Sequence, residues 1–299
     1  MPSETLRSDE LIFTVPLSGW CGGEPFSQSA LSALEQGKVL SLPELGFRLQ
    51  PEEMLCLHES TVRKGRKNVS YRADSGQLSG FARPQDEPLL RGLLQRHHQS
   101  CDALLRSLLP RYTKALHTPV NTLRVHPVTA WKEGSSWRKD DTRLHVDAFP
   151  SRPMQGERIL RIFTNINPHG EARVWRLGGA FTDTARQFLP QTGRYSPWLC
   201  ALQYKLGITK GYRTRYDHLM LGLHDAMKAD TEYQLSGPQL EMRFPPASSW
   251  ICFSDQTPHA AMSGQFMLEQ TYSLPVGNME DPQRSPLKIL EKMIGSPLI

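Results

Sequence analysis

One short segment of the chain carries a histidine and a carboxylate at a spacing that suits a metal ion. Residues 143–147 read Arg-Leu-His-Val-Asp and alternate polar with apolar side chains, as an extended strand does. Residues two apart on a strand point to the same face, so His145 and Asp147 would project together. Such a pair supplies two ligands of a facial triad, the protein ligand set of non-haem Fe(II) oxygenases.

The third ligand of such a triad must come from a distant part of the chain. His259 is the best candidate, because it follows one predicted strand and precedes the next. Two histidines and one carboxylate would leave coordination positions open for a bidentate cosubstrate and O₂. In the alternative interpretation, His145 and Asp147 form an ordinary strand pair and His259 caps a turn. Four other histidines stand in predicted helices and are interpreted as packing or surface residues: His97, His98, His218 and His224.

The elements around these residues predict a β-rich core. Extended patterns occupy residues 122–131, 142–149, 158–165, 172–177, 239–244, 250–253 and 265–274, and helical patterns occupy 182–189 and 213–228. Strands in this number without regular intervening helices favour an antiparallel sandwich or jelly roll. We therefore expect an α+β protein with a double-stranded β-helix (jelly-roll) core flanked by helices.

The preceding residues have mixed patterns. Short strands are predicted at 11–15 and 38–42 and a helix at 29–36, and the clearest helix begins at Asp86 and ends before Pro110. The expected organisation is an N-terminal mixed α/β segment over 1–120 that packs on the core, a jelly-roll core over 121–280 with a helical insert at about 181–235, and a C-terminal helix within 281–299.

Composition and charge limit the possible partners. The chain of 299 residues has 35 Lys+Arg and 30 Asp+Glu, a net charge of +5, which is too weak to predict nucleic-acid binding. No apolar run approaches the ~20 residues of a membrane span and the N-terminus is polar, so we expect a cytoplasmic protein. Five scattered cysteines without a C-x-x-C pair are expected to be reduced and buried.

Longer stretches of the sequence resemble one family. They are residues 64–68 (Lys-Gly-Arg-Lys-Asn), 145–150, 160–168 and 258–266, and they are similar to the Kdo hydroxylases of the Fe(II)/2-oxoglutarate-dependent dioxygenases. The resemblance implies an enzyme that uses Fe(II), O₂ and 2-oxoglutarate to hydroxylate C3 of a Kdo sugar (3-deoxy-D-manno-octulosonic acid) in the lipopolysaccharide inner core. It implies that His145, Asp147 and His259 bind the iron. The alternatives are a dioxygenase for another substrate, such as a protein side chain, and a non-catalytic jelly-roll sugar-binding protein.

The cosubstrate site departs from the commonest pattern of the superfamily. Many members hold the far carboxylate of 2-oxoglutarate with an arginine about ten residues after the distal histidine, but residues 268–271 here contain no cation. Other members place a basic residue on a strand soon after the histidine–carboxylate pair, and Arg161, 14 residues after Asp147, fits that pattern. A guanidinium buried among apolar residues needs an anionic partner, which the carboxylate of 2-oxoglutarate would supply. The alternative is a structural ion pair between Arg161 and an internal carboxylate. Gln270 and Trp175 are expected to contact the same cosubstrate, whereas Arg158 is expected on the opposite, solvated face.

Lys64, Arg66 and Lys67 form a short basic run that would attract an anionic substrate. A Kdo-containing lipid A glycolipid is such a substrate, because it carries carboxylates and phosphates at a membrane surface. The alternative is an ordinary solvated loop. We accordingly expect substrate contacts from these three residues and peripheral contact with the anionic inner membrane.

Overall fold

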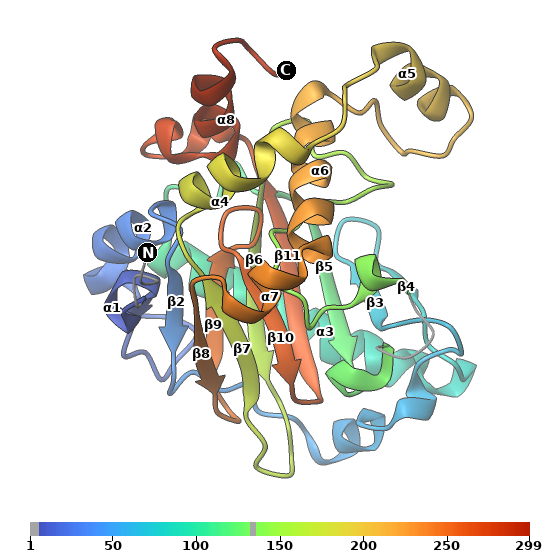
Figure 1. Cartoon of the computed structure of the whole chain (residues 1–299). Coiled ribbons are helices and arrows are strands. Elements are labelled where there is room, and N and C mark those ends of the chain that lie inside the picture. The colour runs from blue at the N-terminus through green and yellow to red at the C-terminus, as the bar shows by residue number, and fades with distance from the viewer. Residues whose placement is uncertain (1–5, 132–135) are drawn as a thin grey trace.

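Two β-sheets form the centre of the protein. The computed structural model describes residues 6–131 and 136–299. The large sheet has the strand order β1-β2-β9-β6-β11-β5-β3-β4 and the small sheet the order β10-β7-β8 (Figure 1). The strands are β1 (Ile12–Thr14), β2 (Val39–Leu42), β3 (Val69–Arg72), β4 (Gln77–Ser79), β5 (His117–Arg124), β6 (Arg158–Asn165), β7 (Arg173–Gly178), β8 (Gln239–Phe244), β9 (Ser249–Phe253), β10 (His259–Ser263) and β11 (Met267–Leu274). Neighbouring strands are antiparallel except β1 and β2.

The two sheets pack face to face through aromatic side chains. Phe163 of β6 meets Trp175 of β7 edge-on at 4.9 Å between ring centroids, and Phe244 of β8 stacks on Trp250 of β9 at 4.1 Å. All four rings are buried. They fill part of the space between the sheets, and Phe163 and Trp175 also line a pocket there.

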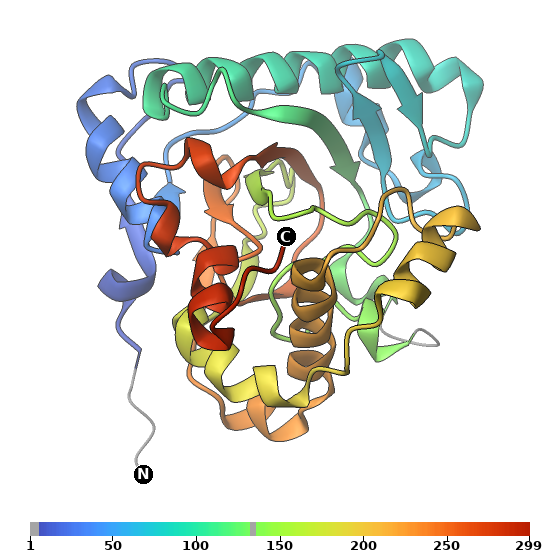
Figure 2. The same cartoon turned by 90° about the horizontal axis from the view of Figure 1, so that it is seen from above.

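A long helix covers the outer face of the large sheet. This helix, α3 (Glu87–Leu108), lies along β5, β11 and β3, as Figure 2 shows from above. Its buried residues Leu90, Leu93 and Leu94 recur at the spacing of one helix face. The predicted helix is therefore confirmed, although the Asp86 side chain pairs with Arg83 instead of capping the helix.

The other helices are mostly short. They are α1 (Ser8–Leu11), α2 (Ser27–Glu35), α4 (Phe181–Phe188), α5 (Pro197–Lys205), α6 (Arg215–Ala229), α7 (Thr231–Ser236) and α8 (Pro286–Ile294). The helices α4 to α7 all lie between β7 and β8 in the chain, and α4 packs against both α6 and α8 at one end of the sheets (Figure 1). None of the helices described is long and apolar enough to cross a bilayer. All five cysteines are free thiols, and only Cys21 is exposed.

Three details of the sheets differ from the sequence predictions. The strand predicted at 122–131 ends at Arg124. The segment predicted as a strand at 142–149 forms only one isolated bridge, between His145 and His259. At Leu144 the backbone N–H and carbonyl bond the Gln234 side chain instead of a neighbouring strand. The segment 1–120 contributes β1 to β4 and the start of β5 to both edges of the large sheet, so it does more than pack on a core.

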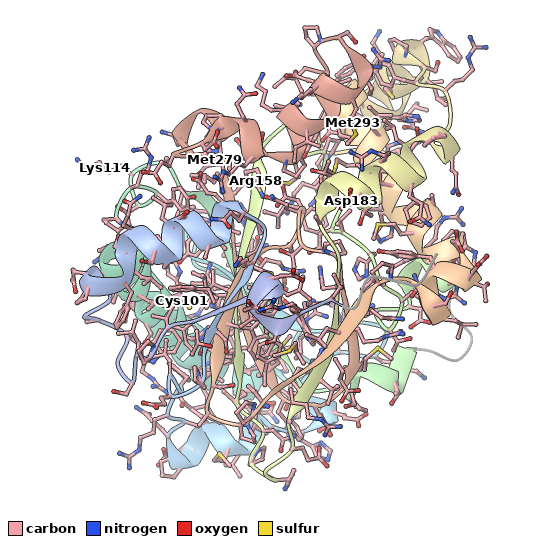
Figure 3. The ribbon with its side chains drawn as sticks, turned by 60° about the vertical axis from the view of Figure 1, so that its left-hand side comes forward. Cys101, Lys114, Arg158, Asp183, Met279 and Met293 are labelled. Atoms are coloured by element: carbon pink, nitrogen blue, oxygen red, sulfur yellow. The ribbon has the colours of Figure 1, made fainter. Side chains whose placement is uncertain are left out.

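Arg158 is buried, and the prediction that it is solvated was wrong. Its Nε donates to Asp255 Oδ2 at 2.7 Å and its Nη2 to Gln256 Oε1 at 2.6 Å, and Figure 3 shows it beside Met279. Asp255 Oδ1 in turn accepts the Ile159 backbone N–H at 3.1 Å. The face of β6 that carries Arg158 is covered by the segment around Met279 and by the turn after β9. This buried pair therefore holds the turn that leads to His259.

Loss of one partner of this pair should destabilise the protein strongly. Arg158→Met would leave the Asp255 carboxylate buried and uncompensated, so we expect the free energy of unfolding to fall by about 3–5 kcal/mol. The control is Arg243→Met, because the pair of Arg243 with Glu241 is exposed and such pairs contribute ~1 kcal/mol or less. Urea denaturation of both variants measures the difference, and equal midpoints would refute the assigned role.

Candidate metal centre

The structure brings together the three side chains that the sequence nominates as metal ligands. Ligand atoms of His145, Asp147 and His259 all lie within 4.8 Å of one another. The backbones of His145 and His259 exchange two hydrogen bonds, at 3.0 and 2.8 Å, and the Asp147 N–H donates to the Ser254 carbonyl at 2.8 Å. The two segments, more than a hundred residues apart, are thus joined beside the turn after β9.

Hydrogen bonds set the orientation of both imidazoles. Nδ1 of His145 lies 2.7 Å from the Arg143 carbonyl, and Nδ1 of His259 lies 2.8 Å from the Thr257 carbonyl. A carbonyl only accepts, so each Nδ1 carries the proton and each Nε2 keeps its lone pair. Metal-binding histidines characteristically donate their second N–H in this way.

The protonation states also suit a cation. Burial lowers the pKa of both histidines, for His145 to about 3, so both imidazoles are neutral near pH 7. Burial opposes ionisation of Asp147, but the Arg161 guanidinium beside it holds the pKa of this carboxyl well below the usual range. Two neutral imidazoles and one carboxylate fit a first-row divalent ion such as Fe(II).

The three side chains line one wall of a pocket of about 200 Å³ between the sheets. Four cationic side chains also line it: Lys67, Arg124, Arg161 and Arg173. Three carboxylates face them: Asp141, Asp147 and Glu269. The pocket has one positive charge in excess, and a bound divalent cation would increase it, so the pocket suits anionic ligands.

Arg161 lies inside the pocket, on the face of β6 that the sequence predicts. Its guanidinium bridges Asp147 and Glu269 through short hydrogen bonds. These are the carboxylate partners that the sequence analysis left as the alternative to a cosubstrate. Arg161 therefore orients the Asp147 carboxylate within the metal centre.

Arg173 has a different environment from Arg161. It is buried on β7, its Nη1 donates to the Gly264 carbonyl at 3.1 Å, and among the described residues no carboxylate lies within ion-pair distance of it. Burial, followed by the nearby Arg124, lowers its pKa to about 10. The Nε atoms of Arg173 and Arg161 and the Trp175 Nε1 are all buried without a hydrogen-bond partner. Unsatisfied buried donors are costly, so the pocket suits a ligand that offers acceptors, and Arg173 differs from Arg161 in lacking a carboxylate partner in the described part of the chain.

Arg173 was missed by the sequence analysis, although a signal for it exists. It stands two residues before Trp175 on one strand, so the two side chains share a face. Trp175 does line the pocket, where its ring stacks on His259 at 5.0 Å between centroids.

The expectation that Gln270 faces the same pocket was wrong. Gln270 lies on the opposite face of β11, where its Oε1 accepts a hydrogen bond from Asn121 Nδ2 at 2.7 Å and lies 3.1 Å from His98 Nδ1. Its neighbour Glu269 lines the pocket instead. Alternation along the strand explains the error, because a shift of one residue moves a side chain to the other face of the sheet.

Comparisons with known proteins agree with this geometry. A family model described as 3-deoxy-D-manno-oct-2-ulosonic acid (Kdo) hydroxylase matches residues 22–297. The chain belongs to the Kdo hydroxylase family. This confirms the resemblance seen in the sequence. Among curated proteins, no sequence matches this Kdo hydroxylase.

Solved structures of one relative are closely similar to this Kdo hydroxylase. The relative is the Kdo hydroxylase KdoO, described as a non-heme Fe(II) α-ketoglutarate-dependent dioxygenase. Its complex with α-ketoglutarate and Fe(III) is 42% identical, with a TM-score of 0.92 and 97% of each chain covered. Its apo structure is 43% identical with the same TM-score and coverage, and its cobalt(II) complex is 43% identical with a TM-score of 0.92 over 96% of this chain and 97% of that one.

The basic run of this Kdo hydroxylase divides between the pocket and the surface. Lys67 Nζ lies 3.0 Å from Asp141 Oδ2 and lines the pocket. Lys64 and Arg66 are exposed on the loop before β3. His224, interpreted as a packing or surface residue, packs edge-on against His145 at 5.3 Å between ring centroids, so it touches the candidate metal centre.

Removal of one candidate ligand should abolish tight metal binding. We expect His145→Ala and Asp147→Ala to lose more cobalt(II) affinity than the ~10–100-fold that loss of a supporting hydrogen bond costs, because a coordinate bond itself is removed. His218→Ala is the control, since this histidine contacts the Gly193 carbonyl outside the pocket. Calorimetric titration of the apoprotein measures all three variants, and an unchanged affinity in both ligand variants would contradict the assignment.

Proposed function

We propose that this chain is an Fe(II)- and 2-oxoglutarate-dependent dioxygenase that hydroxylates C3 of a Kdo sugar in a Kdo-lipid A precursor. Membership of the Kdo hydroxylase family and the similarity to KdoO support the activity. The observation that carries the proposal is the donor set of two neutral imidazoles and one carboxylate within 4.8 Å, at the wall of a pocket rich in cations. That combination suits a metal ion together with anionic ligands.

The sheet arrangement supports a double-stranded β-helix as the core. β5, β11, β6 and β9 are consecutive in the large sheet, and the bridge at His145 adds the preceding segment beside β10, β7 and β8. Residues 121–280 would then be the jelly-roll core, and 181–235 its helical insert. We place the protein at the cytoplasmic face of the inner membrane, where a Kdo-lipid A precursor would be within reach.

Residues of the pocket have separate roles in this proposal. His145, Asp147 and His259 would hold the iron, and Arg161 keeps the second oxygen of Asp147 engaged. Bound Fe(II), together with O₂ and 2-oxoglutarate, would supply the oxidising chemistry for hydroxylation at C3 of the sugar. Trp175, stacked on His259, restrains that ring and covers it from water.

We assign the far carboxylate of 2-oxoglutarate to Arg173. Its guanidinium is buried and, unlike that of Arg161, lacks a carboxylate partner among the described side chains, and Trp175, whose Nε1 has no partner, lines the same pocket. A dicarboxylate would satisfy both donors. The assignment of this role to Arg161, made from the sequence, stays a prediction that the titration below separates from Arg173.

The sugar and its anionic groups would enter past the basic run. Lys67 lies in the pocket beside Asp141, within reach of a carboxylated sugar, whereas Lys64 and Arg66 are exposed outside it. We propose that Lys67 contacts the sugar and that Lys64 and Arg66 attract its charge from solution.

The activity is tested with purified protein, Fe(II), 2-oxoglutarate, O₂ and a Kdo-lipid A precursor. Mass spectrometry should find one added oxygen atom on Kdo, with one succinate formed per product. Asp147→Ala should give no product, and Lys64→Glu with Arg66→Glu should raise KM about tenfold or less with kcat unchanged, because these charges lie outside the pocket. Succinate formation without oxygen on the sugar would show that the substrate is wrong.

Anaerobic titration with 2-oxoglutarate tests the cosubstrate site. The Fe(II) complex should develop the weak visible charge-transfer band of a chelated keto acid. Arg173→Ala should raise the half-saturating 2-oxoglutarate concentration about 10–100-fold, since a charge-assisted hydrogen bond is lost. Arg161→Ala should weaken iron binding instead, and Arg243→Met should match the wild type. If Arg161→Ala raised the half-saturating 2-oxoglutarate concentration and Arg173→Ala did not, the far carboxylate would be assigned to Arg161.

A further inference from the structure

Apolar side chains are exposed together on and after α5. Six of the ten exposed large hydrophobic residues in the described chain lie here: Trp198, Leu199, Leu202, Tyr204, Leu206 and Ile208. Trp198 exposes 73% of its surface and Leu206 65%. In both views α5 stands out from the body of the protein (Figures 1 and 2). Soluble proteins seldom expose such a group of residues unless it binds something. We call these six residues the α5 patch.

The surroundings of the α5 patch are strongly basic. Residues 184–216 contain six Lys and Arg and no Asp or Glu, so this stretch alone exceeds the net charge of +5 of the whole chain. Arg194, Lys205 and Lys210 are exposed among or beside the apolar residues. An apolar surface interleaved with cations matches the chemistry of an anionic lipid surface, whose acyl region takes the apolar side chains and whose headgroups take the charges.

The α5 patch is joined to the wall of the metal pocket. After the patch, the Lys210 N–H donates to the Ser151 carbonyl at 2.8 Å, and Arg213 Nη2 donates to the Pro150 carbonyl at 2.6 Å. The residue before this pair, Phe149, lines the pocket, and Asp147 stands two positions earlier. A surface bound by the α5 patch would therefore lie near the segment that carries Asp147.

We propose that the α5 patch inserts into the surface of an anionic lipid bilayer. Trp198 and Tyr204 would lie at the headgroup level, where aromatic residues with a polar tip are enriched in membrane proteins. Leu206 and Ile208 enter the acyl boundary, and Arg194, Lys205 and Lys210 contact the headgroup phosphates. The inference rests on the proposed function, because a lipid-linked sugar is the substrate that requires the pocket to meet a bilayer.

Vesicle flotation of the full chain tests this surface without iron, cosubstrate or sugar. The protein should float with vesicles of phosphatidylglycerol and phosphatidylcholine, and less with phosphatidylcholine alone. The triple variant Trp198→Ser, Leu206→Ser, Ile208→Ser should bind the anionic vesicles at least about tenfold more weakly. High salt should weaken binding of the wild type, since the charged part of the attraction is screened.

The control is Leu235→Ser, which removes a side chain that is 78% exposed on α7 outside the α5 patch and should leave vesicle binding unchanged. Circular dichroism melts verify that the triple variant is folded. Equal flotation of the triple variant and the wild type would overturn the proposal, as would failure of the wild type to float. A dimer in solution that the triple variant abolishes would also overturn it, by assigning the α5 patch to a second copy of the chain. None of these results depends on turnover, so a failed activity assay and a failed docking surface are distinguishable.

Discussion

The functional centre depends on the backbone hydrogen bonds that join the His145 segment to the start of β10 and to the turn after β9. Two histidines meet because their backbones pair directly, and Asp147 joins them because its N–H is bound by the same turn. The position of this turn is fixed by Asp255, which pairs with the buried Arg158 and accepts the Ile159 backbone N–H of β6. The preorganisation of the ligands is thus a property of backbone geometry supported by one ion pair in the core.

Charge in the pocket is balanced by a chain of alternating groups. Lys67 and Arg124 face Asp141, Arg124 and Arg161 face Glu269, and Arg161 faces Asp147. Each buried charge in this series has a partner of opposite sign, which makes its burial tolerable. Arg173 departs from the series, because no described carboxylate pairs with it, and it accounts for the one positive charge in excess.

Periodic patterns in the sequence were sufficient for much of the fold. β6 and β8 occupy the predicted residues 158–165 and 239–244, and α8 lies within the predicted 281–299, because alternation and helical spacing report burial directly. The metal candidates were likewise predictable from one short motif and one distant histidine. The face of Gln270 was not, since it depends on a register that the surrounding strands set. The missing partner of Arg173 and the exposure of α5 depend on contacts between distant segments, which local patterns do not carry.

Gln234 has a consequence beyond the shape of the sheets. Its side-chain amide accepts from the Leu144 N–H at 2.6 Å and donates to the Leu144 carbonyl at 3.0 Å, as the backbone of an adjoining strand would. An open edge at this point would present free backbone groups to another polypeptide and invite aggregation through added strands. One glutamine of α7 thus closes the edge beside the small sheet, and the segment that leads into His145 and Asp147 is kept from pairing with a neighbouring molecule.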